Sequence, residues 1–204
     1  MRHEAWELDD VLDGIDGVAY AVDLRYRILA VGRTRWNEFA AGNGALELTA
    51  ASVLGQNLFD IIQGDDVREV YRRYTDETIA TSRPIALALR CDSPGVRREL
   101  RLAITPLRSA GVLRGVHFQS LAVDELVRPP IDLFDFKTLM AVVGGQHHSP
   151  IVTLCSFCQR VNRAASGAEP VWIDAEEYYR SGGTSNVRIS HGLCSDCLDK
   201  HYGI

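Results

Sequence analysis

Residues 85–121 read IALALRCDSPGVRRELRLAITPLRSAGVLRGVHFQSL, and this stretch holds three β-strand patterns in succession. Apolar residues recur at every second position, which is typical of strands with one buried face. They are Ile85, Leu87, Leu89 and Cys91 in the first pattern, Leu100, Leu102 and Ile104 in the second, and Val116 and Phe118 in the third. Turn-forming sequences separate the patterns at residues 92–95 (DSPG) and 109–111 (SAG). Such short connections predict that the three strands pair antiparallel.

The sequence before this stretch predicts helices and two further strands. A helix is expected over residues 64–84, because two acidic residues suit the positive end of its dipole and a proline ends the pattern. Residues 17–23 (GVAYAVD) and 26–32 (YRILAVG) are apolar, β-rich runs in a hairpin-like arrangement. Residues 8–15 have the apolar spacing of a short amphipathic helix. This order predicts an α+β fold, in which a five-stranded antiparallel sheet carries helices on one face.

Three short motifs within residues 18–122 resemble those of PAS sensor domains. They are Ala21-Val22-Asp23 before the first turn, residues 36–40 (WNEFA) in a helical segment, and residues 54–59 (LGQNLF). The resemblance implies a sensory role and a small-molecule cavity between the helices and the sheet. Aromatic residues that would line such a cavity, and that fit an ordinary core as well, are Trp36, Phe39, Phe59, Tyr71 and Tyr74. No residue pattern identifies the ligand.

The chain divides by composition into four parts. We assign residues 1–17 to an N-terminal helix, 18–122 to the PAS-like domain, 123–150 to a connector and 151–204 to a cysteine module. The connector contains proline and glycine breaks, yet it is too apolar for a free linker. We therefore expect part of it to pack on a domain or on a second copy of the chain, and to carry a signal.

The last part of the chain contains two Cys-x-x-Cys pairs, Cys155/Cys158 and Cys194/Cys197. At this spacing a pair bends the backbone into a knuckle whose thiolates converge on one cation, and two knuckles supply four tetrahedral sulfur ligands. A module of about 50 residues has little core, so a metal would contribute much of its folding energy. We predict a zinc ion bound by these four cysteines.

Other uses of these thiols stay open. An iron–sulfur cluster or another iron site also takes four thiolates, and each pair has the spacing of a redox dithiol. The four cysteines could also be unconnected buried side chains. We expect His191 to donate a hydrogen bond to a ligand or simply to pack, with replacement of one sulfur as the alternative. Between the pairs, Asp174 and Glu177 form a capping-box pattern that predicts a helix.

The last fifty or so residues resemble a zinc-ribbon-like module that is appended to bacterial PAS proteins, response regulators and histidine kinases. The resemblance rests on residues 155–161 (CSFCQRV), Trp172, residues 176–179 (EEYY) and residues 190–198 (SHGLCSDCL). Because the biochemical role of that module is poorly defined, the resemblance implies a setting in bacterial signal transduction and no mechanism.

Charge and motif content narrow the class of function. The net charge of −5 argues against nucleic acid as the main partner, because phosphate binding requires a concentrated basic surface. No nucleophile, phosphate-binding, kinase or cyclase motif occurs, so we expect no enzymatic activity; a metal site with one open position is the enzymatic alternative. The N-terminus does not resemble a signal peptide and no apolar run could cross a bilayer, so we expect a cytoplasmic protein with no membrane partner.

These features together predict a non-catalytic sensory protein. The PAS-like domain would detect a small ligand, a redox state or a partner, and the cysteine module would stabilise or relay that state. We expect a homodimer that acts on a signalling protein not identified by the sequence. The alternative is a thiol switch, in which oxidation of the cysteines releases the metal.

Overall fold

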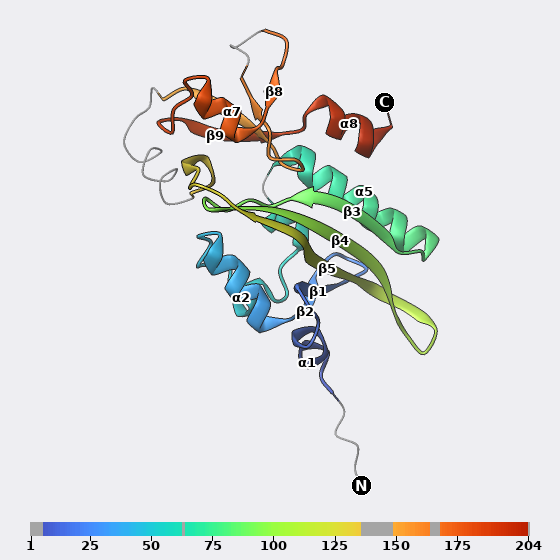
Figure 1. The fold of residues 1–204 in the computed structure, drawn as a ribbon. Helices are drawn as coiled ribbons and strands as arrows, with labels where there is room; N and C mark the ends of the chain where they lie inside the picture. The colour runs from blue at the N-terminus through green and yellow to red at the C-terminus, as the bar shows by residue number, and fades with distance from the viewer. Residues whose placement is uncertain (1–5, 63, 136–148, 164–167, 204) are drawn as a thin grey trace. The chain divides into compact units, whose positions relative to one another are not determined.

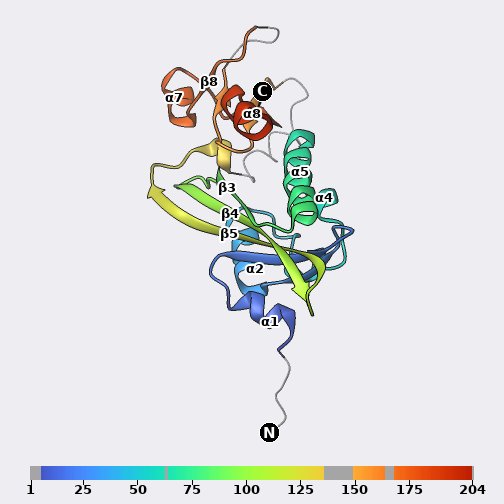
Figure 2. The ribbon, with the colours of Figure 1, turned by 90° about the vertical axis from the view of Figure 1, so that its right-hand side faces the viewer.

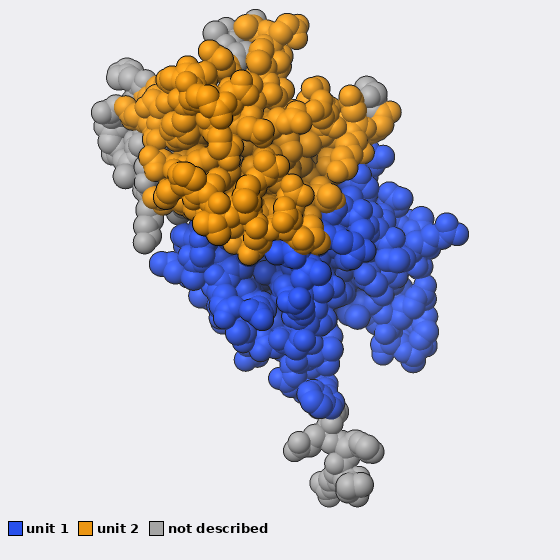
Figure 3. All heavy atoms as spheres, in the orientation of Figure 1, with its two compact units in different colours: residues 1–62, 71–87, 101–122 blue, residues 63–70, 88–100, 123–204 orange. Residues whose placement is uncertain are grey.

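A computed structural model of the chain describes residues 6–62, 64–135, 149–163 and 168–203. The chain forms two compact units, which Figure 3 distinguishes by colour. Unit 1 comprises residues 1–62, 71–87 and 101–122, and unit 2 comprises residues 63–70, 88–100 and 123–204. The predicted boundaries at residues 17 and 150 stay predictions.

A five-stranded sheet is the main feature of the fold (Figure 1). Its strands are β1 Val18–Asp23, β2 Ile28–Val31, β3 Ile85–Arg90, β4 Val96–Ser109 and β5 Val112–Val127, in the spatial order β2-β1-β5-β4-β3. Strand β1 pairs antiparallel with β2 and with β5. The predicted α+β class, with a five-stranded antiparallel sheet and helices, is confirmed. Strand β5 runs further than its sequence pattern indicated, and the backbone N–H of Arg128 just beyond it donates to the carbonyl of Gly95.

Helices cover the two faces of the sheet within unit 1. They are α1 Leu8–Asp13, α2 Arg33–Gly42, α3 Ala50–Val53, α4 Leu58–Ile61 and α5 Asp65–Thr81, the last of which begins in unit 2 (Figures 1 and 2). Trp36 of α2 contacts Tyr20, whereas Leu12 of α1 packs with Ala19 and Ala21. Because successive strand residues point to opposite faces, α1 and α2 lie on opposite sides of β1.

The C-terminal part of unit 2 has a small sheet of its own. Its strands are β6 Ile151–Cys155, β7 Val161–Asn162, β8 Trp172–Ile173 and β9 Arg188–Gly192, in the order β8-β7-β6-β9. Strand β6 pairs antiparallel with β7 and parallel with β9. The helical elements are η1 Asp132–Phe134, α7 Ala175–Arg180 and α8 Ser195–Tyr202.

One apolar cluster forms the core of this module. Its buried members are Ile131, Leu133, Val152, Leu154, Val161, Ala175, Tyr178 and Val187. Ile131 and Leu133 belong to the segment predicted as a connector, and their burial accounts for its apolar composition. Residues 123–127 of the predicted connector belong to strand β5, which corrects its start, and residues 136–148 lie outside the described residues.

The prediction of a capping box at the start of α7 is wrong, because the side-chain hydrogen bond from the helix to Asp174 does not form. Asp174 does occupy the N-cap position, but its side chain makes no hydrogen bond to the helix. Its carboxylate instead accepts a hydrogen bond from Nη1 of Arg90, at 3.3 Å. A hydrogen bond between charged partners is stronger than one to a backbone amide, so the arginine takes the carboxylate.

Candidate metal centre

The two cysteine pairs converge at one point in unit 2. Their four Sγ atoms all lie within 4.8 Å of one another, and this is the one group of three or more potential metal ligands found among the residues that the structure describes. Cys155, Cys194 and Cys197 are buried and Cys158 is half-buried. The four side chains therefore lie close enough to hold a metal ion, as the spacing predicted.

The first pair lies in a tight turn at the end of β6. The backbone N–H of Cys155 donates to the carbonyl of Arg160 at 2.8 Å, and the N–H of Gln159 donates to the carbonyl of Cys155 at 2.8 Å. Gln159 has a left-handed backbone, with φ of 60°. These bonds fold the backbone back on itself, so both sulfurs face the same side of the turn.

The second pair lies at a helix N-terminus and not in a second strand turn, which corrects the picture of two similar knuckles. Cys194 is the N-cap of α8 and Cys197 lies in its first turn. Residues three apart share one face of a helix.

Strand pairing brings the two pairs together. Gly192, two residues before Cys194, is the register partner of Cys155 in the parallel β6–β9 pair. The N–H of Ser156 donates to the carbonyl of Gly192 at 3.0 Å. A Cβ atom on Gly192 would lie 3.3 Å from Cγ2 of Thr153, so glycine relieves crowding at this crossing. The Ser-His-Gly sequence thus belongs to the strand that delivers the second pair beside the first.

His191 lies on β9 opposite Leu154 and is exposed. It is not a member of the four-residue group. Its predicted contribution to the site, as a hydrogen-bond donor or a replacement ligand, stays a prediction.

The electrostatics of the centre favour the ionisation of one of the four thiols and oppose the ionisation of all four. Hydrogen bonds from the side chains of Cys158 and Cys197 lower the pKa of Cys155, and the N–H of Cys194 adds to this at 3.4 Å from the sulfur. The same interaction with Cys155 raises the pKa of Cys158 to about 12 and also raises the pKa of Cys197. Four thiolates this close repel one another, and a divalent cation would supply the charge that allows all of them to ionise.

The donor set fits a single ion. A tetrahedral ion with metal–sulfur bonds of about 2.3 Å places its sulfurs about 3.8 Å apart. The Sγ atoms of Cys158 and Cys194, from different pairs, are 3.6 Å apart. Arg160 lies beside the first pair, but its Nη1 donates to Asp196 at 2.6 Å, which raises the pKa of the arginine. The charge of Arg160 is therefore already paired with Asp196.

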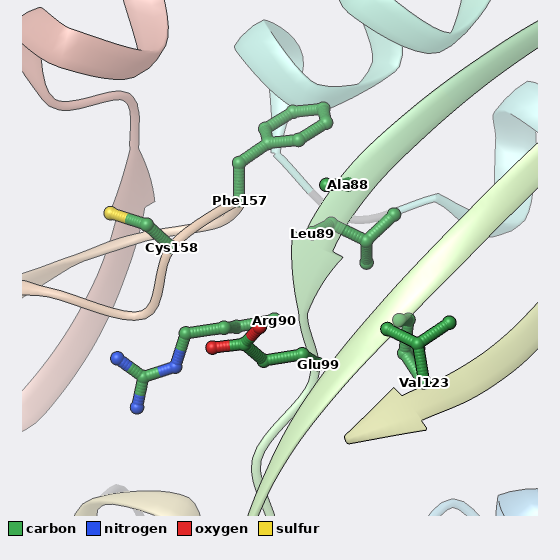
Figure 4. Close-up of a pocket in the computed structure, with 8 residues that line it drawn as sticks. Ala88, Leu89, Arg90, Glu99, Val123, Phe157 and Cys158 are labelled. Carbon is green, nitrogen blue, oxygen red and sulfur yellow. The ribbon is translucent and has the colours of Figure 1, made fainter.

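A shallow groove borders the first cysteine pair. It has a volume of about 160 Å³, and its lining residues are Ala88, Leu89, Arg90, Glu99, Leu100, Val123, Phe157 and Cys158. Figure 4 shows the Phe157 ring and the Cys158 sulfur pointing in different directions from the same turn. The side chains of β3 and of the cysteine turn leave this space between them.

The aromatic residues predicted to line a PAS cavity lie in unit 1. Phe59 is buried, and Trp36, Phe39, Tyr71 and Tyr74 are half-buried. Tyr20 is a further aromatic side chain that sequence reasoning missed: its ring stacks on Phe118 at 4.8 Å and meets Trp36 edge-on at 5.5 Å. Burial raises the pKa of Tyr20 well above its usual range. Its place in the alternating run GVAYAVD was the signal that could have identified it.

Comparison with known proteins shows a likeness of structure only. No protein-family model and no curated protein sequence matches the chain. A sensory box sensor histidine kinase from Vibrio cholerae matches 57% of this chain and 90% of its own, with 16% identity and a TM-score of 0.41. The PAS domain of BvgS from Bordetella pertussis matches 56% and 82%, with 17% identity and a TM-score of 0.44.

VqmA from Vibrio cholerae, in a complex with ligand and DNA, matches 58% of this chain and 51% of its own. Its identity is 14% and its TM-score is 0.45. At these identities and scores the matches do not extend to function.

Among the described residues, no helix has the length and apolar character needed to cross a membrane.

Proposed function

We propose that this chain is a PAS-type sensory protein whose C-terminal module holds one zinc ion through Cys155, Cys158, Cys194 and Cys197. The observation that carries the proposal is the convergence of the four sulfurs within 4.8 Å. Four thiolates around one tetrahedral ion form a closed structural site, for which zinc is the usual metal. A closed site leaves no open position for substrate or water, which supports a non-catalytic role.

The sulfur spacing favours one ion over an iron–sulfur cluster. In a [4Fe–4S] cluster each cysteine binds a different iron, so the sulfurs lie well beyond contact distance. In a [2Fe–2S] cluster the two cysteine pairs are likewise separated by the two irons, whereas here all four Sγ atoms lie within 4.8 Å of one another. A single iron ion bound by four thiolates would have the same geometry as zinc, and the metal analysis below distinguishes the two.

The sensory part of the proposal rests on the sheet domain. The PAS-like motifs and the order of strands and helices support a domain that detects a small ligand, a redox state or a partner. We propose that the protein acts as a homodimer in the bacterial cytoplasm and passes its signal to another protein. Nucleic acid is not proposed as a partner, because the charge pattern does not favour it.

Metal analysis of freshly purified protein tests the zinc assignment. We expect close to one zinc per chain, no visible absorption band, and four thiols that react with a thiol reagent only after a strong chelator is added. The fifth thiol, Cys91, is half-buried and lies outside the group, so it is counted separately in unfolded protein. A visible absorption spectrum of an iron–sulfur or iron–thiolate site would identify the metal as iron and not zinc. Four reactive thiols with no metal would overturn the proposal.

A redox switch is the second candidate, and the short distance between Cys158 and Cys194 favours it. At 3.6 Å these two sulfurs need only a small displacement to form a disulfide when peroxide takes two electrons from the two thiolates and is itself reduced to water. The disulfide removes two ligands, so the metal is released. Mild peroxide treatment followed by metal and thiol counts tests this idea. Zinc that stays bound, with all thiols still reduced, would eliminate the switch.

A further inference from the structure

Unit 2 contains a buried cluster of charged side chains, Arg90, Asp92 and Arg128. The exposed fractions of the three side chains are 9%, 0% and 6%. The guanidinium groups of Arg90 and Arg128 both donate to Oδ2 of Asp92, and the distance from Arg128 is 2.9 Å. Nε of Arg90 also donates to Oδ1 of Asp92. The backbone N–H of Arg98 completes the shell of this carboxylate at 3.2 Å. A carboxylate with no exposure is stable only when it is paired and hydrogen-bonded in this way.

One further donor of each arginine reaches the cysteine module. Nη1 of Arg90 donates to Asp174 at 3.3 Å, and Nη1 of Arg128 donates to Glu176 at 2.6 Å. Asp174 is the N-cap of α7 and Glu176 lies in its first turn. The cluster therefore joins the end of β3 and the segment after β5 to one helix of the module.

Arg90 also contacts the metal-binding turn through its backbone. Its N–H donates to the carbonyl of Phe157 at 2.7 Å, between the first two cysteines. Strand β3 is an edge of the five-stranded sheet, so the outer amides of this strand have no neighbouring strand to pair with. The cysteine turn therefore supplies the acceptor for the last amide of the edge strand.

Polar contacts contribute to this connection. The groove of about 160 Å³ lies where β3 meets the cysteine turn, so the side chains there are incompletely packed. The backbone hydrogen bond from Arg90 and the ion pairs of its side chain span the same junction. Hydrogen bonds of this kind persist only while both partners are held in place.

We propose that Arg90, held in position by Asp92, couples the metal-binding turn to strand β3, so that loss of the metal releases the end of β3. The inference rests on the proposed function, because it requires a metal at the four cysteines. When the turn loses its ligand, the Phe157 carbonyl is no longer fixed and the Arg90 amide loses its acceptor. The buried Asp92 cluster makes the position of Arg90 depend on the module and on the sheet at once.

Hydrogen exchange with mass spectrometry on the full chain tests the coupling, with metal content measured on each sample. In the wild-type protein, chelation is expected to speed exchange of the Arg90 amide and its neighbours in residues 88–92 by about tenfold or more. In Asp92→Asn the same amides are expected to exchange fast with one metal still bound, and to respond little to chelation. Amides of β1 serve as the internal reference for global stability.

Glu125→Gln is the matched control, because Glu125 forms an exposed ion pair with Arg98 at 2.6 Å outside the buried cluster. It should keep the wild-type response. If Asp92→Asn fails to fold, the double variant Asp174→Asn/Glu176→Gln carries the test, since both acceptors are partly exposed, at 52% and 37%, and Asp92 keeps its arginines. This variant should also reduce the response of residues 88–92 to chelation.

The outcomes separate the two proposals. A wild-type protein that binds no metal contradicts the proposed function. A wild-type protein that binds one metal, but whose residues 88–92 exchange at the same rate with and without it, contradicts the coupling alone. A full wild-type response in both cluster variants also overturns the coupling.

Discussion

Unit 1 and unit 2 bury different kinds of group. The core of unit 1 is apolar, and side chains with no exposure include Val22, Val31, Ile104 and Val116 together with Phe118. Unit 2 buries a smaller apolar cluster, but it also buries four thiols that could bind a metal and a carboxylate between two arginines. The comparison indicates that unit 1 is stabilised by burial of apolar surface, whereas unit 2 also buries paired charges and, on the proposed function, depends on a bound ion.

This difference has a consequence for the proposed sensory function. Apolar packing changes little with the chemical state of the surroundings, but a thiolate centre responds to oxidants, chelators and acid. A region that depends on such a centre can change while its neighbour keeps its fold. We expect unit 2 to be the responsive region of the chain.

The largest expected effect is the loss of the module in Cys197→Ser. Removal of one ligand should abolish tight metal binding, and structural zinc contributes on the order of 10 kcal/mol to the folding of small modules. Hydrogen exchange should show residues 151–162 and 187–202 exchanging at rates close to those of an unfolded chain. Amides of β1 should keep their protection.

Cys91→Ser is the matched control, since Cys91 lies outside the four-cysteine group. It should retain metal and a protected module. A protected module in metal-free Cys197→Ser would contradict the contrast between the two units, because the module would then be stable without its ion.

The converse variant, Phe118→Ala, should lower the stability of unit 1 and leave the metal content unchanged. Phe118 has no exposure and stacks on Tyr20, so the truncation should lower the free energy of unfolding by about 3–5 kcal/mol. Urea unfolding followed by circular dichroism measures this loss, and elemental analysis should still find one metal per chain. Val127→Ala, at a side chain that is 82% exposed, should change stability by less than about 0.5 kcal/mol. Loss of metal in folded Phe118→Ala would show that the units are not separable in this way.

Sequence patterns predicted the parts of the molecule that local rules govern. Alternating apolar residues located the strands, and the Cys-x-x-Cys spacing predicted that four thiols converge. The same spacing did not reveal that Cys194 caps a helix, because a knuckle and a helix N-terminus share the two-residue gap. Strand β5 exceeded its prediction for a similar reason: its last residues are exposed, so no alternation marks them.

The charged cluster could not be predicted at all. In the run IALALR, alternation assigns Arg90 to the face opposite Leu87 and Leu89, where an arginine is normally solvated. One of the carboxylates that pair with it is that of Asp174, which lies 84 positions away in the chain. The hydrogen bond from Arg90 to Asp174 also takes the place of the contact that the capping box predicted. Only the tertiary structure brings such partners together, and local propensity gives no signal for them.

A smaller effect, which depends on pH, is expected from a histidine in unit 1. Nε2 of His117 is buried and has no hydrogen-bond partner among the described residues, and burial lowers the pKa of this imidazole below its usual 6.5. The folded state therefore takes up its proton at lower pH than the unfolded state does. Stability should be fully present above about pH 7 and should fall as the pH drops below the unfolded pKa of about 6.5.

His117→Gln removes this titration, so its unfolding free energy should depend less on pH than that of the wild type between pH 7.5 and 5.5. Urea unfolding of both proteins at the two pH values measures the difference. Acid also weakens metal binding, because the thiols must be deprotonated, but that effect is common to both proteins and cancels in the comparison. Equal pH dependence would mean that His117 titrates normally in the folded state, and that the acid sensitivity of the chain arises elsewhere, with the metal centre of unit 2 as the first place to look.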